Sequence, residues 1–429
     1  MPASPSRPGA LVCLAALVAC QNPPTPLRAV NDPALRVGPA AAILGALLVD
    51  GTGGPALADA VVVIQDGMIT AVGPRGAVAI PGGADTVGAQ GRTLLPGLID
   101  AHFHLDGDAA LPVEYLDRGV TSLRDPGAWI RAYDTALAMG RPAPRLFLTG
   151  PHLDGVGPAH PGDALVVRGA DEARGAVQRF ATEGASAIKL YYRLPTAEMA
   201  AATREAHRLG LPVTTHLEIV DVTEALALGV DGIEHITSFG TVLAGPEAAD
   251  AYRRGVQADN QHRRNGRYAM WATIDPSGPA AERLAAVAGA SGAFVVPTLA
   301  VFERRPGDPD TDSVQVHAFQ RMVRFTSLLH KAGVPLLVGS HSSVPHAPRG
   351  GAYLRELELL VSAGLTPAEA IHAATLGAAR AFRLDERLGS VEVGKRADLV
   401  LVEGNPLADI GHAGSVRAVM LNGAWVLRR

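Results

Sequence analysis

Short hydrophobic runs alternate with segments of helical periodicity through the middle of the chain. That alternation is typical of βα units built around a parallel sheet. The hydrophobic runs lie at residues 93–104, 120–124, 145–149, 187–191, 213–216, 232–235, 293–300 and 335–340. Strands at these positions, with helices between them, predict an α/β fold, specifically a (β/α)₈ TIM barrel over residues 93–382.

Two of the predicted helices begin at residues with recognisable N-terminal capping patterns. Asp221 with Glu224, and Thr366 with Glu369, have the spacing of a capping box. Pro367 stands at a first helical position, where its missing N–H costs nothing. We therefore expect helices to begin directly after Asp221 and Thr366.

Residues 38–92 show a different pattern, with short strands, turns and no helical period. Two apolar runs flank Asp66-Gly67, a pair of residues that favours a tight hairpin. We expect this stretch to form part of a small β-domain.

The first residues have the pattern of a targeting segment. Arg7 is followed by an apolar run at 10–19, too short to span a bilayer, that ends in Leu17-Val18-Ala19-Cys20. This ending resembles the lipobox of bacterial lipoproteins, which implies a signal peptide over residues 1–20 and lipidation of Cys20. Residues 21–37 are proline-rich and predict a tether. The expected location is the periplasmic face of a membrane in the bacterial cell envelope.

The size and the net charge of the chain limit the classes of binding partner that we expect. The chain has 429 residues, which suits a large barrel with a smaller domain. Its net charge is −4 and it has no basic runs, so no nucleic-acid partner is indicated. The expected partners are a small molecule and, through the lipid anchor, a membrane. The sequence is also compatible with a homo-oligomer.

The first predicted strand ends in Asp100-Ala101-His102-Phe103-His104. Side chains alternate along a strand, so Asp100, His102 and His104 point to one face. Two imidazoles on one face can bind a metal ion, although hydrogen bonds alone could also satisfy them. Asp100 could orient a ligand imidazole, or it could bond to backbone at the strand end.

Three other predicted strands place reactive side chains at the same end of the barrel. The fifth ends in His216 and the sixth in His235, and the fourth carries Lys189 where the interior should be apolar. A buried lysine is costly unless it is neutralised or modified. Together with the pair on the first strand, these residues predict a metal site.

These residues resemble the amidohydrolase superfamily. The resemblance is carried by the run from Pro96 to His104, by Lys189, His216 and His235 in that order, and by the tail segment at 394–407. It is nearest to the imidazolonepropionase-like branch, which includes dipeptidases of the prolidase type. The resemblance implies a barrel flanked by a β-sandwich built from both chain ends, in which residues 38–92 pair with 383–429.

The resemblance also implies two divalent metal ions. His102 and His104 would hold one ion, His216 and His235 the other, and Lys189, carboxylated on its amine, would bridge them. A carbamate turns a buried cation into the anion that two divalent cations need. Zinc suits these ligands, while iron and manganese remain open. Such a pair would supply a hydroxide nucleophile and a Lewis acid.

One position departs from the family pattern. After the eighth strand the family has an aspartate that binds metal and transfers a proton, whereas this chain has His341 within Gly339-Ser340-His341-Ser342. Imidazole can act as ligand and as base, though not with one nitrogen. Alternatively, the site holds one metal or a different pair, or hydrolysis has been lost. His341 is therefore both a metal-ligand and a catalytic candidate.

Substrate-binding candidates follow the strand ends. Tyr191 shares the inward face with Lys189, and Tyr192 and Arg193 follow in the loop, where Arg193 could pair with a substrate carboxylate. His160 lies in the loop after the third strand, and residues 239–292 are long enough to form a lid. For each single residue, an ordinary surface loop is the alternative that the sequence favours.

Together, these patterns predict a metal-dependent hydrolase of amide or peptide bonds, in which metal-activated hydroxide attacks an N-acyl amino acid or a dipeptide-like molecule. The alternative, motivated by His341, is a metal-loaded pseudoenzyme or ligand-binding periplasmic lipoprotein.

Overall fold

The computed structural model describes residues 25–429. The predicted signal peptide and the lipidation site at Cys20 lie outside the described residues. Within 25–429, no helix combines the length and the hydropathy needed to cross a bilayer.

Both ends of the described chain meet in one eight-stranded mixed sheet. Its order is β17-β16-β15-β5-β1-β2-β3, and β4 pairs with β1. The bounds are β1 Ala41–Leu48, β2 Leu57–Gln65, β3 Met68–Pro74, β4 Asp85–Gly88, β5 Arg92–Pro96, β15 Leu399–Glu403, β16 Val416–Leu421 and β17 Ala424–Arg428. The central pairing is β5 with β15, antiparallel, in which Leu95 lies opposite Val400.

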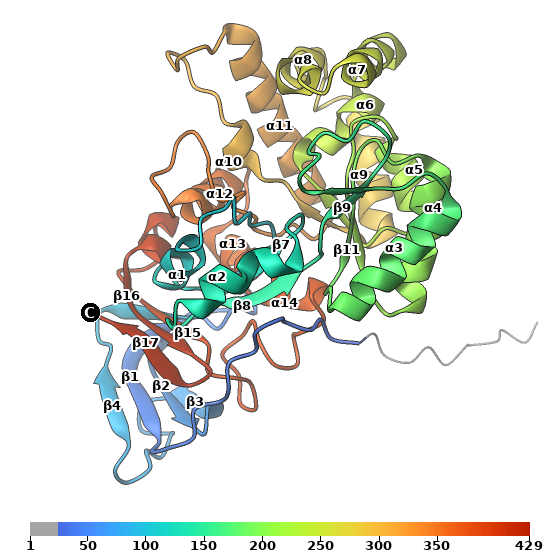
Figure 1. Ribbon diagram of the computed structural model, residues 1–429. Helices are drawn as coiled ribbons and strands as arrows, with labels where there is room; N and C mark the ends of the chain where they lie inside the picture. The colour runs from blue at the N-terminus through green and yellow to red at the C-terminus, as the bar shows by residue number, and fades with distance from the viewer. Residues whose placement is uncertain (1–24) are drawn as a thin grey trace, which may run out of the picture.

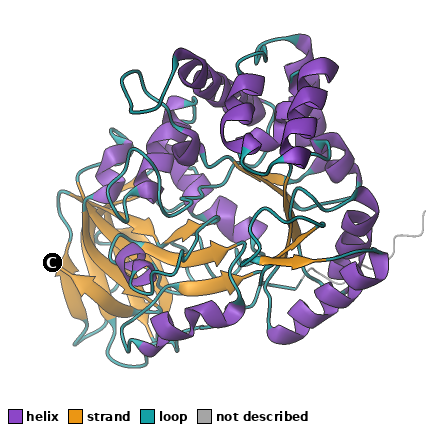
Figure 2. Cartoon of the chain, turned by 45° about the horizontal axis from the view of Figure 1, so that its top comes forward, coloured by secondary structure: helices purple, strands orange, loops and turns teal. Residues whose placement is uncertain are grey.

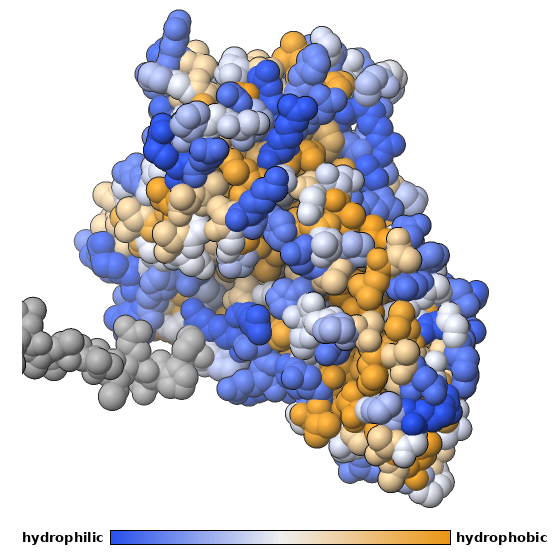
Figure 3. Space-filling view, turned by 180° about the vertical axis from the view of Figure 1, so that it is seen from behind, coloured by the Kyte–Doolittle hydropathy of each residue, from blue (hydrophilic) through white to orange (hydrophobic). Residues whose placement is uncertain are grey.

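This sheet curves back on itself. The predicted β-sandwich would have two separate hydrogen-bonded sheets, whereas all eight strands here belong to one sheet. Ile69 in β3 exchanges backbone hydrogen bonds with the segment before β15: its N–H donates to the carbonyl of Lys395, and its carbonyl accepts from Gly394. Apolar residues from six of the strands gather in one cluster on one face. Hydrophobic surface is also concentrated at this end of the molecule, seen from behind in Figure 3.

The rest of the chain is an α/β unit with two parallel sheets. The three-stranded sheet is β6-β7-β8 and the six-stranded sheet is β10-β9-β11-β12-β13-β14. Their bounds are β6 Leu98–Asp100, β7 Val120–Asp125, β8 Arg145–Leu148, β9 His152–Asp154, β10 Ala164–Val166, β11 Ile188–Leu190, β12 Val213–His216, β13 Gly232–Glu234 and β14 Phe294–Val296. Figure 2 shows the strands inside a layer of helices.

A few backbone hydrogen bonds connect the edges of these two sheets. Ser186 N–H donates to Leu148 O at 2.7 Å, between β11 and β8. At the other edge, Leu337 N–H donates to Val295 O at 2.9 Å and Ala101 N–H donates to Val338 O at 2.8 Å. Regular pairing does not continue around the ring.

Two predicted strands therefore differ from expectation. The run at 335–340 forms one isolated β-bridge, between Val295 and Leu336, and does not extend into a strand. The run at 93–104 divides at Gly97, so that β5 belongs to the mixed sheet and β6 begins the α/β unit. The hydrophobic pattern could not show this division, because both pieces are buried.

The helices lie outside the parallel strands and, after β13, form a raised group at one end of the molecule (Figure 1). They are α1 Leu111–Leu116, α2 Asp134–Ala138, α3 Ala170–Glu183, α4 Thr196–Arg208, α5 Val222–Ala227, α6 Gly240–Leu243, α7 Pro246–Ala258, α8 His262–Trp271, α9 Pro279–Ser291, α10 Leu299–Phe302, α11 Ser313–Lys331, α12 Ala352–Ser362, α13 Pro367–Ala374 and α14 Leu376–Ala381. Short 3₁₀ turns lie at Ile130–Tyr133, Ile236–Phe239 and Ile410–Gly414.

One of the two predicted capping boxes is present. Thr366 and Glu369 make both reciprocal hydrogen bonds at the start of α13, with Pro367 in its first turn. Asp221 makes no side-chain cap bond at α5; its carboxylate accepts hydrogen bonds from Thr241 and Arg253 instead. A nearby guanidinium is the stronger partner for a carboxylate, and this explains the difference.

The mixed sheet packs directly on the α/β unit. Val400 in β15 is fully buried and contacts Gly119, just before β7. A Cβ at Gly119 would lie 2.8 Å from a Val400 methyl group, and the φ of Gly119 is +89°. Glycine is therefore required here by both space and backbone conformation.

The expected tether is not free over its described part. Residues 25–37 run along the α/β unit, where Leu27 is buried and Val30 N–H donates to Leu146 O at 2.9 Å. Asp32 pairs with Arg145 and Arg396. The prolines that predicted an extended segment also suit an extended strap held by such contacts.

Arg145, at the start of β8, holds three parts of the chain together. It is 2% exposed, and its guanidinium pairs with Asp398 before β15 and with Asn422 in the β16–β17 turn. Its Nε donates to Asp32 in the strap at 3.0 Å. Because each partner comes from a different segment, this one cation fixes their relative positions.

Replacing Arg145 with Met should leave Asp398 buried without its counter-ion. We expect the free energy of unfolding to fall by about 3–5 kcal/mol, measured by denaturant and thermal unfolding. Arg75→Met is the control, since Arg75 pairs with Asp59 at the surface and should change stability by less than about 1 kcal/mol. Similar losses in both variants would contradict the role assigned to Arg145.

Candidate metal centre

Asp100, at the end of β6, sets the position of the first histidine through the backbone. Its Oδ1 accepts from the N–H groups of His102 and Ser340, both at 3.0 Å. Among the described residues it makes no hydrogen bond to an imidazole, and its bonds to backbone are those of a strand-end anchor. Burial raises the pKa of Asp100 to about 6. The anchor ties the segment after β6 to the segment that carries His341.

His102, His104 and His341 form the first half of the site. The Nε2 atoms of His102 and His104 lie 3.1 Å apart, and the rings of His102 and His341 stack with centroids 5.3 Å apart. One ligand nitrogen from each of the three lies within 4.8 Å of the others, close enough to share one metal ion. His341 has a φ of +56°, and its N–H donates to the carbonyl of His102 at 2.7 Å.

His216 and His235 form the second half. Their ring centroids are 4.5 Å apart, and His235 lies 4.6 Å from His102, so the two halves are continuous. His235 Nδ1 pairs with Thr298 Oγ1 at 2.7 Å, and His216 Nε2 pairs with Glu218 at 2.8 Å. His216 Nδ1 has no partner among the described residues. Each ring thus keeps one nitrogen for a ligand.

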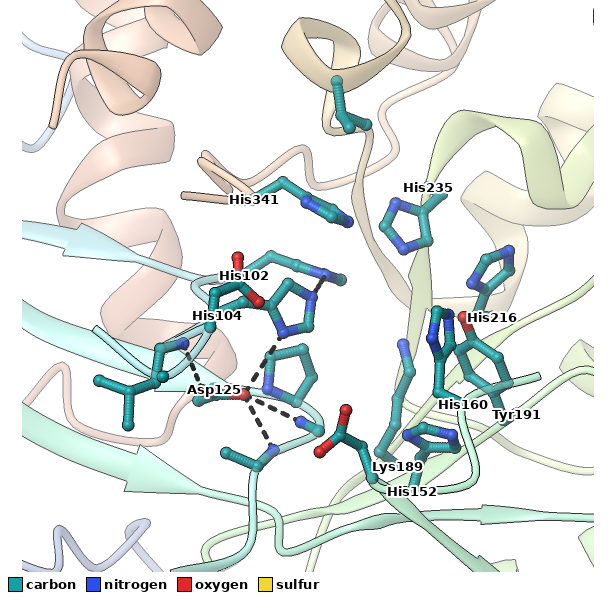
Figure 4. A pocket seen from close by; sticks show the side chains of 18 of the residues that line it. His102, His104, Asp125, His152, His160, Lys189, Tyr191, His216, His235 and His341 are labelled. Carbon is teal, nitrogen blue, oxygen red and sulfur yellow. Dashed lines mark hydrogen bonds and ion pairs between the residues drawn. The ribbon is translucent and has the colours of Figure 1, made fainter. Parts of the chain in front are cut away.

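Lys189 lies between the two halves, as Figure 4 shows. Its side chain is 2% exposed, and its amine has no hydrogen-bond partner in the described chain. The nearest carboxylate oxygen, from Glu234, is 3.7 Å away. Burial lowers the pKa of Lys189 to about 7, although Glu234 acts in the opposite direction. A free amine is therefore populated near neutral pH, which carboxylation requires.

Glu234 is the central anion of the site and was missed in the sequence. It accepts from His102 Nδ1 at 2.5 Å, pairs with the buried Arg124 and faces Lys189. Although burial raises its pKa, these cations hold the pKa of Glu234 well below its usual range. Strand alternation would direct neighbouring residues to opposite faces, but His235 has a φ of +63°, so Glu234 and His235 both serve the site.

Two further carboxylates orient histidines and were also missed. Asp125, at the end of β7, lies 3.6 Å from His104 Nδ1 and accepts from Tyr133 OH at 2.7 Å. Glu218 bonds to His216 and accepts from Tyr252 OH at 2.5 Å. An acidic residue close after each strand end was the available signal, because ligand imidazoles commonly pair with carboxylates.

A cavity of about 820 Å³ opens above these residues. It is lined by Tyr191 and His160, as predicted, and by His152, which the prediction did not select as a site residue. Tyr192 and Arg193 do not line it. Tyr192 OH donates to Asn260, and the Arg193 guanidinium donates to the carbonyl of Val256 at 2.5 Å. The end of α7 therefore binds the arginine that was expected to meet a substrate.

The predicted lid, residues 239–292, forms the four helices α6 to α9. Of these, α8 borders the cavity, through Arg263, Arg264, Arg267 and Tyr268. These arginines were not identified from the sequence, because the facing side of a helix after a long loop depends on tertiary packing.

The donor set fits divalent metal ions. Burial lowers the pKa of His102 to about 3 and that of His216 to about 4, and it lowers the pKa of His235 and His341 well below the ordinary value. These four rings are neutral near pH 7, as metal ligands must be. His216 Nδ1 and the Lys189 amine are buried polar atoms without a hydrogen-bond partner among the described residues, and a bound metal ion would satisfy them.

Comparisons with known sequences agree with this chemistry. The sequence profile of the Amidohydrolase family matches residues 93–426. Adenine deaminase of Paracoccus denitrificans (strain Pd 1222) is 23% identical over 350 residues, which is 79% of this chain and 50% of the deaminase. A 40-residue stretch is 55% identical to imidazolonepropionase of Geobacillus sp. (strain WCH70) and covers 9% of each chain. The chain thus spans half or less of the length of these curated relatives.

A crystal structure described as that of a prolidase from Bifidobacterium longum is similar to this fold over nearly the whole chain. It is 28% identical, with a TM-score of 0.71, and the match covers 92% of this chain and 96% of that one. The fold therefore matches that of a prolidase-like structure over 92% of this chain.

Metal analysis of the purified protein should give one to two equivalents of a transition metal. Lys189→Ala should lose most of it, and His341→Ala should lose metal from the half formed with His102 and His104, because each removes a predicted ligand. His317→Ala is the control, since His317 is exposed on α11. Metal-free parent protein with the same fold, or full occupancy in Lys189→Ala, would be incompatible with this assignment.

Proposed function

The chain belongs to the amidohydrolase family, of the prolidase and imidazolonepropionase-like branch, and from this membership we propose that it is a metal-dependent hydrolase of amide or peptide bonds. The proposed substrates are N-acyl amino acids or dipeptide-like molecules. The observation that carries the proposal is the set of five histidines gathered around buried Lys189 at the base of a cavity large enough for such a molecule. We also propose that the few backbone hydrogen bonds between the two parallel sheets close a (β/α)₈ barrel around this site.

The proposed metal ligands follow the two halves of the site. His102, His104 and His341 would hold one ion, His216 and His235 a second, and carboxylated Lys189 would lie between them. Zinc is the proposed metal, because imidazoles dominate the set. When bound, divalent ions supply a Lewis acid for the substrate carbonyl and lower the pKa of water.

The chain's own residues would position these ligands and move the proton. Glu234, Asp125 and Glu218 fix the rings of His102, His104 and His216, so that one nitrogen of each faces the centre. His341 is neutral near pH 7, and the ring nitrogen not used as a ligand can accept the proton of the attacking water. The same nitrogen would return that proton to the leaving amine.

A second candidate, a ligand-binding protein without turnover, is favoured by one observation. His341 replaces the carboxylate expected of the family, and the three groups that could share an ion there are all histidines. A cluster with one less negative charge holds its ions less firmly and shuttles protons differently.

We also propose the lipid anchor and the periplasmic location. Mass spectrometry of membrane-extracted protein should show an N-terminal, diacylated Cys20. An unmodified chain that begins at Met1 would contradict both the anchor and the location derived from it.

The enzyme proposal predicts turnover of a panel of dipeptides and N-acyl amino acids by the metal-loaded protein. Burial, together with His104 and His102, lowers the pKa of His341, so its base form persists to lower pH than a free imidazole's. The acidic limb of the pH–rate profile should therefore lie below about pH 6.5. His341→Ala should reduce kcat about a hundredfold or more, and His341→Asp should retain activity.

These variants also separate the two candidates. Parent-like turnover in His341→Ala would show that His341 is not the proton shuttle. A parent that is inert with metal bound, beside a His341→Asp variant that hydrolyses amides, would identify the protein as a binding protein.

A further inference from the structure

Part of the lining of the cavity above the predicted metal ligands is cationic. Three arginines from α8 and Arg304, just after α10, line it. Arg263 and Arg267 are one helical turn apart and so share a face of α8. Figure 1 shows α8 in the raised group of helices at the end of the molecule.

Most of these cations have no anion beside them. Among residues 25–429, no carboxylate oxygen lies within ion-pair distance of Arg263, Arg264 or Arg304. Arg267, which is 7% exposed, lies 3.7 Å from Glu218, and that carboxylate already serves His216. Guanidinium groups that are partly buried are normally paired, so unpaired ones facing a cavity indicate an anionic ligand.

The contacts that Arg263 and Arg304 do make leave their charges uncompensated. Arg263 donates to His160 Nε2 at 2.7 Å, and burial lowers the pKa of His160 to about 4, so this partner is neutral. The Arg304 guanidinium donates to the carbonyl of Glu303 and lies 5.0 Å from the ring centroid of Tyr268. These contacts fix the direction of both side chains without neutralising them.

Acidic residues elsewhere in the cavity do not offset this charge. Asp125 is committed to His104, Tyr133 and backbone N–H groups. Asp106 and Asp163 are exposed and pair with none of the four arginines. His152, 4% exposed, also faces the cavity with an Nε2 that has no partner among the described residues. The wall therefore offers more donors than one substrate carboxylate would use.

We propose that this arginine wall, formed by Arg263, Arg264, Arg267 and Arg304, selects substrates with two carboxylates, such as amides of acidic amino acids. The proposal rests on the proposed function for the position of the scissile bond. One carboxylate is satisfied by a single bidentate guanidinium, so three unpaired arginines accommodate a second. Apolar residues also line the cavity, among them Trp129 and Phe302, and can pack against the carbon chain.

Binding can be tested without hydrolysis. Glutarate and pentanoate have equal carbon chains and no scissile bond, and differ by one carboxylate. Calorimetry on the metal-loaded protein should give at least tenfold tighter binding of glutarate. Arg263→Gln and Arg304→Gln should each reduce the glutarate-to-pentanoate ratio about tenfold, since a hydrogen-bonded charge is lost. Arg264→Gln, at an exposed position, is a variant with little risk to folding and should act in the same direction.

Arg254→Gln is the matched control. Arg254 is exposed on α7, outside the cavity, and its loss changes the net charge equally. It should leave the ratio unchanged, and thermal unfolding should confirm that all variants are folded. Equal affinity for glutarate and pentanoate, or a ratio that falls as much in Arg254→Gln, would overturn the proposal.

Turnover distinguishes this proposal from the proposed function. N-acetyl-L-glutamate should be hydrolysed with a lower KM than N-acetyl-L-glutamine, and Arg263→Gln should abolish the difference. Selective glutarate binding without any amide hydrolysis would retain the arginine wall and reject the enzyme. Hydrolysis without preference for the acidic substrate would reject the arginine wall and retain the enzyme.

Discussion

The balance of buried charge around Glu234 is the constraint on which the site depends. This carboxylate is enclosed with Arg124 and Lys189 and also fixes the ring of His102. Without it, two cations would remain in the interior, at a cost of several kcal/mol each. With it, Arg124 has a counter-ion and the ring of His102 keeps one nitrogen directed at the centre of the site. Glu234 therefore contributes both to folding stability and to the positioning of the predicted metal ligands.

Much of the site could be predicted, because strand alternation and strand ends are encoded locally. His102 and His104 follow from the spacing in β6, and Lys189, His216 and His235 from the ends of later strands. The orienting carboxylates could not be found in this way. Glu234 depends on the positive φ of His235, which breaks the alternation that the prediction used. Arg193 was misplaced because the carbonyl end of α7, distant in sequence, binds it.

The fold was predictable to a similar degree. Hydrophobic runs located seven of the parallel strands, whereas the run at 335–340 keeps only one bridge. That segment must turn sharply to place His341, whose left-handed backbone and neighbouring Ser342 interrupt regular pairing. Such strain is commonly retained where function requires a particular side-chain position. The family match and the prolidase-like structural neighbour support the same architecture.

The pairing of β5 with β15 has a consequence for how the chain is made. Leu95 and Val400 are neighbours in space but about three hundred residues apart in sequence. During synthesis, β1 to β3 and β5 must wait with an unpaired edge until the last strands emerge, which exposes a template for unwanted strand addition. Completion of this sheet is therefore a late, post-synthetic event. Loss of β15 to β17 would leave β5 without its partner, so the folding of β1 to β5 depends on strands made about three hundred residues later.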